Sequence, residues 1–395
     1  MRKLIRGTIR RRRGTVLALT GALMPVLVGL VAVSLDPGVV AVARNQLSTA
    51  ADAAALAGAG ELARARYASP TGTIGVLDIN NARVQAILAA KNNYILNSSQ
   101  GVVLLDSDVT VGPPPSLSTA DVNLFNTVTV TASCDGTRNP RVPSFFGQLW
   151  GATPTTLQLT SAATAQPCQV SGFRSVNNFN ANLLPIVLDL PTYRAMVEGQ
   201  TTDQYTYNAA TGTVTSGPDG ITESQLYPVK NGDPGNWGTI DIGVNNNSTS
   251  ILGDQIRYGI TPIQLATFPN GTISLDQADN STSPPTPYHV FNGNPGISAG
   301  LKDDLASIVG RPVRIPIYDQ TGGNGNNAWY RVVKFVGVRI LSVNFRGNPK
   351  YVIVQPAQVK DATATMKPVP QQFPDPSQDW RGWNPGDPIV LHLTR

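Results

Sequence analysis

A run of 21 residues without a charged side chain, Thr15 to Leu35, constrains this chain more than any other stretch of its sequence. A helix of that length rises about 31 Å, which matches the hydrocarbon core of a bilayer. A secretory signal peptide has a shorter apolar region, of about 7–15 residues. The run therefore favours a retained membrane anchor over residues 15–36. Removal as a signal peptide stays open as an alternative, because Ala41-Val42-Ala43 resembles a cleavage site.

The residues before this run account for the positive net charge of the chain. Seven of the 30 Lys and Arg residues lie in the first thirteen positions, and the rest of the chain has 23 basic and 25 acidic residues. Basic residues beside an apolar helix mark its cytoplasmic side. A nucleic-acid partner would instead require basic residues gathered on the folded body. We therefore expect no nucleic-acid binding and a cytoplasmic tail over residues 1–14, whose last basic residues are Arg10, Arg11, Arg12 and Arg13.

The helical pattern continues past the apolar run into an alanine-rich segment, residues 37–68. Alanine has the highest helix propensity, and the first glycines after Gly38 are Gly58 and Gly60. Small residues four apart, such as Ala50 and Ala54 or Ala53 and Ala57, permit close approach of another helix. Two interpretations remain open: the segment packs on its own domain, or it packs against other copies and partners.

The residues on both sides of this junction resemble a known family. The stretches "RRRRGTVLALTGALMPVLVGLVAVSLD" and "RNQLSTAADAAALAGA" are similar to the N-terminal region of TadE/TadG-like proteins of Tad (Flp) pilus assembly. In that family a basic start precedes one transmembrane helix that ends in an acid, here Asp36, and an alanine-rich motif follows, here from Arg44. Prepilin cleavage requires a glutamate at the fifth position after the glycine, and Leu19 occupies that position after Gly14.

The resemblance implies a single-pass protein of the bacterial inner membrane, with its N-terminus in the cytoplasm and its body in the periplasm or outside the cell. It implies partners among Tad pilus or secretion components and a homo-oligomer through the N-terminal helix. Two roles of Asp36 stay open. Its carboxylate either pairs with a cation of a neighbouring subunit, such as Arg44, or is simply hydrated at the membrane border.

Residues 69–171 predict a small pilin-like α/β domain. Residues 83–96 predict an amphipathic helix, and the alternation in Val128-Thr129-Val130-Thr131 predicts a strand. A short helix between this strand and the next would make the two strands parallel, an arrangement that the resemblance also implies. Two cysteines would then meet at one edge of the sheet, which predicts a disulfide in an exported protein, with unpaired thiols as the alternative. These residues are Cys134 and Cys168.

Residues 172–395 predict a second extracytoplasmic domain with a mixed, mainly antiparallel sheet. Apolar strands such as "RPVRIPIYD" and "YRVVKFVGVRILSVNF" alternate with turn-rich stretches, and Leu301, Leu305 and Ile308 predict one face of a short helix. The whole chain is therefore expected to have an α+β fold. The resemblance extends to this part without implying an activity for it.

Two patterns suggest chemistry. Gly296-Ile297-Ser298-Ala299-Gly300 matches the nucleophile pattern G-x-S-x-G, and His392 follows it in the chain. No strand and helix alternation surrounds this pattern, and Ser298 fits a helix cap better. Asp279-Asn280-Ser281-Thr282-Ser283 matches the D-x-S-x-S pattern of a metal-dependent adhesion site, whereas Asp189 follows an apolar strand without the serines.

The two histidines, His289 and His392, lie far apart in the sequence, which disfavours a zinc site. We therefore expect a protein without enzymatic activity, cofactor or metal, which acts as a structural or assembly component. A membrane-tethered hydrolase and a metal-dependent adhesion protein remain the alternatives.

Overall fold

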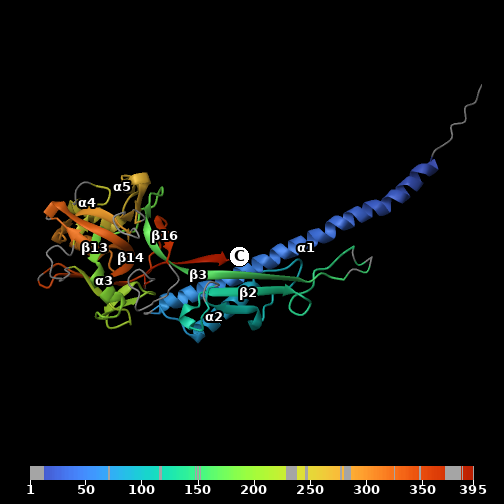
Figure 1. Ribbon diagram of the computed structural model, residues 1–395, viewed down its shortest axis with the longest axis horizontal. Coiled ribbons are helices and arrows are strands. Elements are labelled where there is room, and N and C mark those ends of the chain that lie inside the picture. The colour runs from blue at the N-terminus through green and yellow to red at the C-terminus, as the bar shows by residue number, and fades with distance from the viewer. Residues whose placement is uncertain are drawn as a thin grey trace, which may run out of the picture.

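The computed structural model describes residues 13–69, 72–114, 118–146, 148, 151, 153–227, 238–244, 248–275, 278–279, 286–323, 325–346, 348–369, 384 and 386–394. One long helix carries an elongated body (Figure 1). The body has an N-terminal part that packs along the second half of this helix, and a larger, sheet-rich C-terminal part beyond the end of the helix. The α+β class that the sequence predicts is confirmed at this level.

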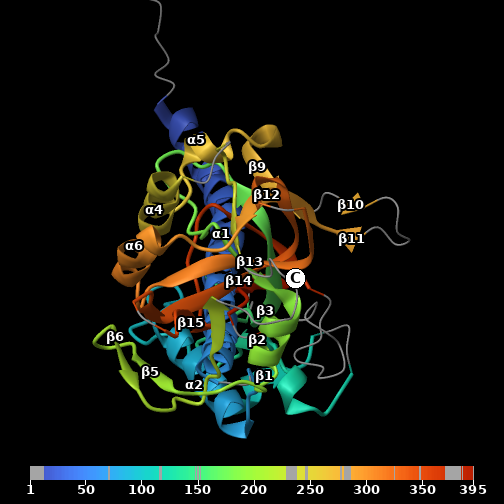
Figure 2. The same ribbon diagram turned by 90° about the vertical axis from the view of Figure 1, so that its left-hand side faces the viewer.

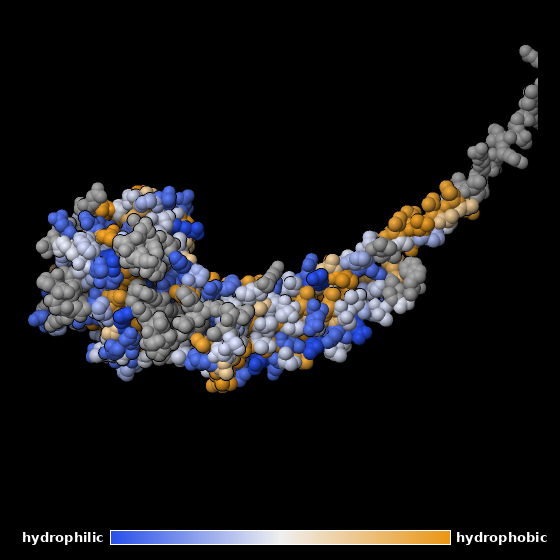
Figure 3. All heavy atoms as spheres, viewed as in Figure 1, coloured by the Kyte–Doolittle hydropathy of each residue, from blue (hydrophilic) through white to orange (hydrophobic). Residues whose placement is uncertain are grey.

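The long helix α1 spans Arg13–Ala68, 56 residues, and continues through Pro25 and Pro37. The predicted segments 15–36 and 37–68 are therefore halves of a single helix. The large apolar side chains that the structure describes between Leu17 and Leu35 are exposed, and they form the orange band on the projecting helix in Figure 3. The helix is long and apolar enough to cross a membrane. Continuous burial against the body begins near Ala43.

The N-terminal part covers α1 with one helix and a small sheet. Val128 and Val130 on β2 are fully buried, as their alternation predicts. The second half of α1 packs against α2 and against strands β2, β3 and β17 (Figures 1 and 2). The elements are α2 (Val76–Lys91), the short 3-10 helices η1 (Asp106–Asp108) and η2 (Val122–Leu124), and strands β1 (Val109–Gly112), β2 (Thr127–Cys134), β3 (Leu157–Arg174) and β17 (Ile389–Thr394).

Strands β2 and β3 pair antiparallel, so the predicted parallel arrangement is wrong. Thr127 lies opposite Thr164 and Cys134 lies opposite Leu157. The predicted crossover helix, residues 142–151, is absent from the described residues 143–146, of which Phe145 and Phe146 form a bend. Gln148 has a 3-10 helical conformation, and residues 147, 149 and 150 lie outside the described residues. The chain turns back at this point through a bridge between Val142 and Thr155.

The antiparallel register also separates the two cysteines. Cys134 ends β2 opposite Leu157, whereas Cys168 lies eleven residues further along β3. At about 3.3 Å per residue this is a separation of roughly 36 Å along the strand, far beyond the reach of a disulfide. Both residues are buried free cysteines, and burial raises the pKa of each thiol. The predicted Cys134–Cys168 disulfide does not form in this fold.

The C-terminal part is built on the long antiparallel pair β13 and β14. Among the described strands, only β4 and β13 pair in parallel, which confirms a mainly antiparallel sheet. Figure 2 shows α4 and α6 side by side at one flank and the β5–β6 hairpin at another. Leu301, Leu305 and Ile308 are buried on one face, as predicted.

The strands of this part are β4 (Ile186–Asp189), β5 (Tyr205–Asn208), β6 (Thr213–Ser216), β7 (Ser224–Tyr227), β8 (Gly238–Ile240), β9 (Thr272–Ser274), β10 (Ala278–Asp279), β11 (Thr286–Pro287), β12 (His289–Pro295), β13 (Pro312–Gly322), β14 (Ala328–Asn344), β15 (Tyr351–Pro356) and β16 (Ala364–Pro368). The helices are α3 (Leu190–Val197), α4 (Thr249–Tyr258), α5 (Pro262–Leu265), α6 (Lys302–Ser307) and the short η4 (Pro269–Gly271), η5 (Ala299–Leu301) and η6 (Gly325–Asn327).

Strand β3 joins the two parts. Its first half pairs with β2 and β17, and its second half pairs with β16, β9 and β14. Ala163 and Ala165 belong to the core under α1, whereas Val170 and Phe173 belong to a core of the C-terminal part. The predicted boundary between residues 171 and 172 falls inside this strand, and β17 returns the chain end to the N-terminal part.

Candidate functional site

Asp36 holds a loop at the point where α1 meets the body. Its carboxylate accepts hydrogen bonds from the hydroxyl of Ser144 at 2.6 Å and from the backbone N–H of Phe145 at 2.8 Å. The N–H of Phe146 donates at 3.2 Å and 3.3 Å to the two oxygens. Hydrogen bonds to a carboxylate are stronger than neutral ones. Asp36 therefore fixes the position of this loop along the helix, a role that its local sequence did not indicate.

The other predicted assembly residues lie apart from Asp36. Arg44 is exposed on α1. It follows Asp36 by eight residues, or about 12 Å of helix rise, so the two side chains do not form an ion pair within one chain. Arg13 is the first residue of α1, and Arg10, Arg11 and Arg12 lie outside the described residues.

The alanine-rich half of α1 packs on its own body. Leu47 and Ala50 are fully buried in the core formed with α2, β2 and β3, and so is Ala54. The pair Ala50 and Ala54 is therefore covered within the chain, which confirms the first of the two interpretations for this face. Ala53 and Ala57 are half-buried.

Asp52 is a site residue that the sequence pattern did not reveal. The hydroxyl of Ser161 on β3 donates a hydrogen bond of 2.5 Å to its carboxylate. Asp52 is the single charged residue between Arg44 and Glu61, and an acid on the buried side of an alanine-rich helix was a signal that could have identified it.

The C-terminal turn of α1 is hydrogen-bonded to the segment around η2 and to the start of β17. Arg66 is buried and donates to the carbonyl oxygens of Gly72, Asn123 and Phe125, while burial lowers its pKa to about 10. The next residue, Tyr67, accepts a 2.5 Å hydrogen bond from the N–H of Ile389 at the start of β17. Burial raises the pKa of the Tyr67 hydroxyl.

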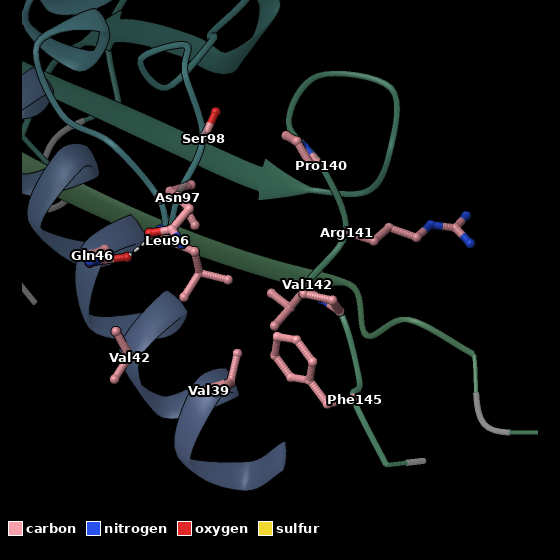
Figure 4. A pocket seen from close by; sticks show the side chains of 12 residues that line it. Val39, Val42, Gln46, Leu96, Asn97, Ser98, Pro140, Arg141, Val142 and Phe145 are labelled. Atoms are coloured by element: carbon pink, nitrogen blue, oxygen red, sulfur yellow. Dashed lines mark hydrogen bonds between the residues drawn. The ribbon is translucent and has the colours of Figure 1, made fainter. Parts of the chain in front are cut away.

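An apolar groove of about 600 Å³ opens beside α1, just beyond Asp36 (Figure 4). Val39 and Val42 project from the helix into it, and Val142 and Phe145 face them from the loop. Gln46 supports one side, because its side-chain oxygen accepts a 2.6 Å hydrogen bond from the N–H of Leu96. The remaining lining residues are Ile95, Asn97, Ser98, Pro140, Arg141 and Pro143.

The residues of the hydrolase alternative lie on different elements. Ser298 caps the short helix η5, with its hydroxyl accepting from the N–H of Gly300 at 3.2 Å and from Thr249 at 3.4 Å. His392 lies on β17 opposite Thr164 of β3. The structure therefore does not pair this serine with that histidine.

The residues of the metal alternative are also dispersed. Asp189 caps α3 by accepting from the N–H of Thr192 at 3.0 Å. Asp279 ends β10, and the rest of its motif, residues 280–283, lies outside the described residues. His289 packs against the ring of Phe291, and burial lowers its pKa. Within the described part of the chain, no three His, Cys, Asp or Glu residues are grouped to hold a metal ion.

The fold and the site together define a class of protein with one long N-terminal helix. The first half of this helix is apolar, and the α+β body packs on its second half. Residues 14–61, which lie within α1, match the family model for Flp pilus-assembly TadE/G-like proteins. This match confirms the family that the N-terminal sequence resembles. Searches of curated proteins and of solved structures gave no match.

Proposed function

We propose that the chain is a structural component of a Tad (Flp) pilus or of a related secretion or adhesion apparatus, anchored in the inner membrane by α1. The observation that carries this proposal is the family match over residues 14–61, which coincides with the helix whose first half is apolar and exposed. An exposed apolar helix of this length is costly in water and stable in a bilayer.

The charge pattern supports the orientation of the anchor. The basic tail before α1 stays in the cytoplasm by the positive-inside rule, so the body lies in the periplasm or outside the cell. Contacts between copies would then use the exposed half of α1, because the Ala50 and Ala54 face is covered by the body. Asp36 contributes by holding the loop of residues 144–146, and Arg44 is available to a neighbouring subunit.

Co-purification from detergent-solubilised membranes tests the assembly role. We expect Tad pilus or secretion components to be recovered with the chain. A matched variant, Arg44→Gln, keeps the fold because this side chain is exposed, and it should recover less of these components if Arg44 pairs across subunits. Recovery of the chain alone, without pilus or secretion components, would contradict the proposal.

We also propose that the body has no catalytic activity. The support is that Ser298, the strongest nucleophile candidate of the sequence, uses its hydroxyl to cap η5. Labelling with a serine-reactive probe should therefore give equal, background signal in the natural chain and in Ser298→Ala. Labelling that disappears in Ser298→Ala would establish the hydrolase alternative instead.

A further inference from the structure

The apolar surface of α1 does not end with its exposed first half. Val39 and Val42 continue it past Asp36, and Val42 is 49% exposed. These two valines form one wall of the groove described above (Figure 4). The groove is therefore continuous with the apolar band that extends from Leu17 to Leu35.

The loop that forms the opposite wall of the groove has a fixed position along the axis of α1. Three donors of residues 144–146 bind the Asp36 carboxylate, so Phe145 lies beside the last turn of the apolar band. Phe145 as a residue is 65% exposed. A phenylalanine ring is wholly apolar, so its exposure to water is costly and its contact with hydrocarbon is favourable.

The rim of the groove also carries a cation. Arg141 is exposed and donates from Nε to the carbonyl oxygen of Asp135 at 2.9 Å. Figure 4 shows its guanidinium pointing away from the groove. A cation and an aromatic ring around an apolar groove are the chemistry that suits a phospholipid, whose phosphate lies above its acyl chains.

We propose that this groove takes an acyl chain of a phospholipid from the membrane that α1 crosses, with the ring of Phe145 against that chain. The volume of about 600 Å³ lies within the range typical of small-molecule sites, about 300–1,000 Å³. The occupant follows from the continuity of the groove with the apolar band of α1. This inference rests on the proposed membrane anchoring and adds a lipid-binding function to the body.

Collision measurements on spin-labelled full-length chains in lipid nanodiscs test the inference. The nanodiscs contain phosphatidylcholine and phosphatidylglycerol, and alanine replaces both native cysteines. One nitroxide label is placed at Phe145→Cys, at Leu23→Cys in the apolar band, or at Phe179→Cys in the C-terminal part, where Phe179 is 55% exposed. Oxygen dissolves in hydrocarbon, whereas a nickel chelate stays in water. The ratio of the label's collision rate with oxygen to its collision rate with the nickel chelate therefore rises when the label is buried in lipid.

We expect the oxygen-to-nickel ratio at residue 145 to exceed the ratio at residue 179 several-fold and to approach the ratio at residue 23. Equal ratios at 145 and 179, with a high ratio at 23, would overturn the lipid site and leave the anchor intact. Low ratios at all three positions would overturn the proposed anchoring itself.

Two further measurements distinguish a lipid from a second protein copy in the groove and test the contribution of Asp36. If a second copy filled the groove, the label at residue 145 would show spin–spin broadening that disappears on dilution with unlabelled chains, and this would overturn the lipid occupant. Asp36→Ala releases the loop, so we expect the ratio at residue 145 to fall toward the ratio at residue 179. An unchanged ratio in this variant would show that Asp36 does not set the position of Phe145.

Discussion

Lys334 and Asp387 form a fully buried ion pair at the junction of the two parts of the body. Lys334 Nζ lies 2.8 Å from a carboxylate oxygen of Asp387, and each side chain is only 1% exposed. The ring of Tyr193 lies 5.6 Å from the ammonium group. Burial lowers the pKa of Lys334 and raises the pKa of Asp387, while each partner opposes the shift of the other. The cost of burying either charge is thus offset mainly by its partner.

Removal of one member of this pair should be more costly than removal of both. Lys334→Met leaves a buried carboxylate without its ammonium partner, so we expect a loss of about 3–5 kcal/mol in the free energy of unfolding. The double variant Lys334→Met, Asp387→Leu should recover most of this loss. Denaturant unfolding of the detergent-solubilised chain measures both. A single-variant loss below about 1 kcal/mol would show that water reaches the pair.

Contacts between residues that lie far apart in the chain could not be predicted from the sequence. Asp36 stands out in the sequence as the acid that follows the apolar run, but its partners Ser144 and Phe145 lie more than one hundred positions away. Residues 142–151 predict a short apolar helix, yet the backbone N–H groups of Phe145 and Phe146 bind Asp36 instead. A local pattern carries no information about such a distant acceptor, which is why the strand direction and the disulfide were mispredicted.

At the scale of elements, α1 packs unequally along its length. A Cβ atom on Gly58 would lie 2.9 Å from Val128 on β2 and 3.0 Å from the carbonyl oxygen of Ala82 on α2. A Cβ atom on Gly60 would meet Leu391 at 3.5 Å, an ordinary contact. The helix, the sheet and α2 therefore approach more closely at Gly58 than at Gly60.

Two alanine substitutions two residues apart should have opposite effects on stability. Gly60→Ala gains helix propensity and should stabilise the fold by about 0.5–1 kcal/mol. Gly58→Ala gains the same propensity but forces β2 or α2 to move, so we expect it to be about 2 kcal/mol less stable than Gly60→Ala. Thermal unfolding followed by circular dichroism compares the two. Equal shifts would mean that the contact at Gly58 relaxes without cost.

The long helix was the element most accessible to prediction. Its apolar run, its alanine content and its family motif all lie within about 50 consecutive residues, so local sequence is sufficient to identify it. Strand alternation likewise predicted β2 through Val128 and Val130. The continuation of β3 across both parts was not predictable, because the turn-rich residues that follow it resemble a domain boundary.

At the scale of the whole molecule, the C-terminal strand β17 closes the N-terminal part. It pairs with β3 from Ala162 to Pro167, and Tyr67 accepts from its first N–H. Deletion of residues 389–395 should therefore reduce hydrogen-exchange protection along residues 162–167 and at the end of α1. Tyr67→Phe is the matched control, because it removes one hydrogen bond and should cost only about 1 kcal/mol. Unchanged protection after the deletion would contradict the closing role of β17.

The continuity of β3 has a mechanical consequence. Its 18 residues extend for about 60 Å, from the sheet against α1 into the sheet of the C-terminal part. A pull on the C-terminal part, resisted by α1, is directed along this strand, and its ladder hydrogen bonds lie across the direction of pull. In this shear geometry neighbouring bonds share the tension and must break together, whereas a peeled strand loses them one at a time. The body would transmit tension to the helix as one stiff unit, without a flexible hinge between its two parts.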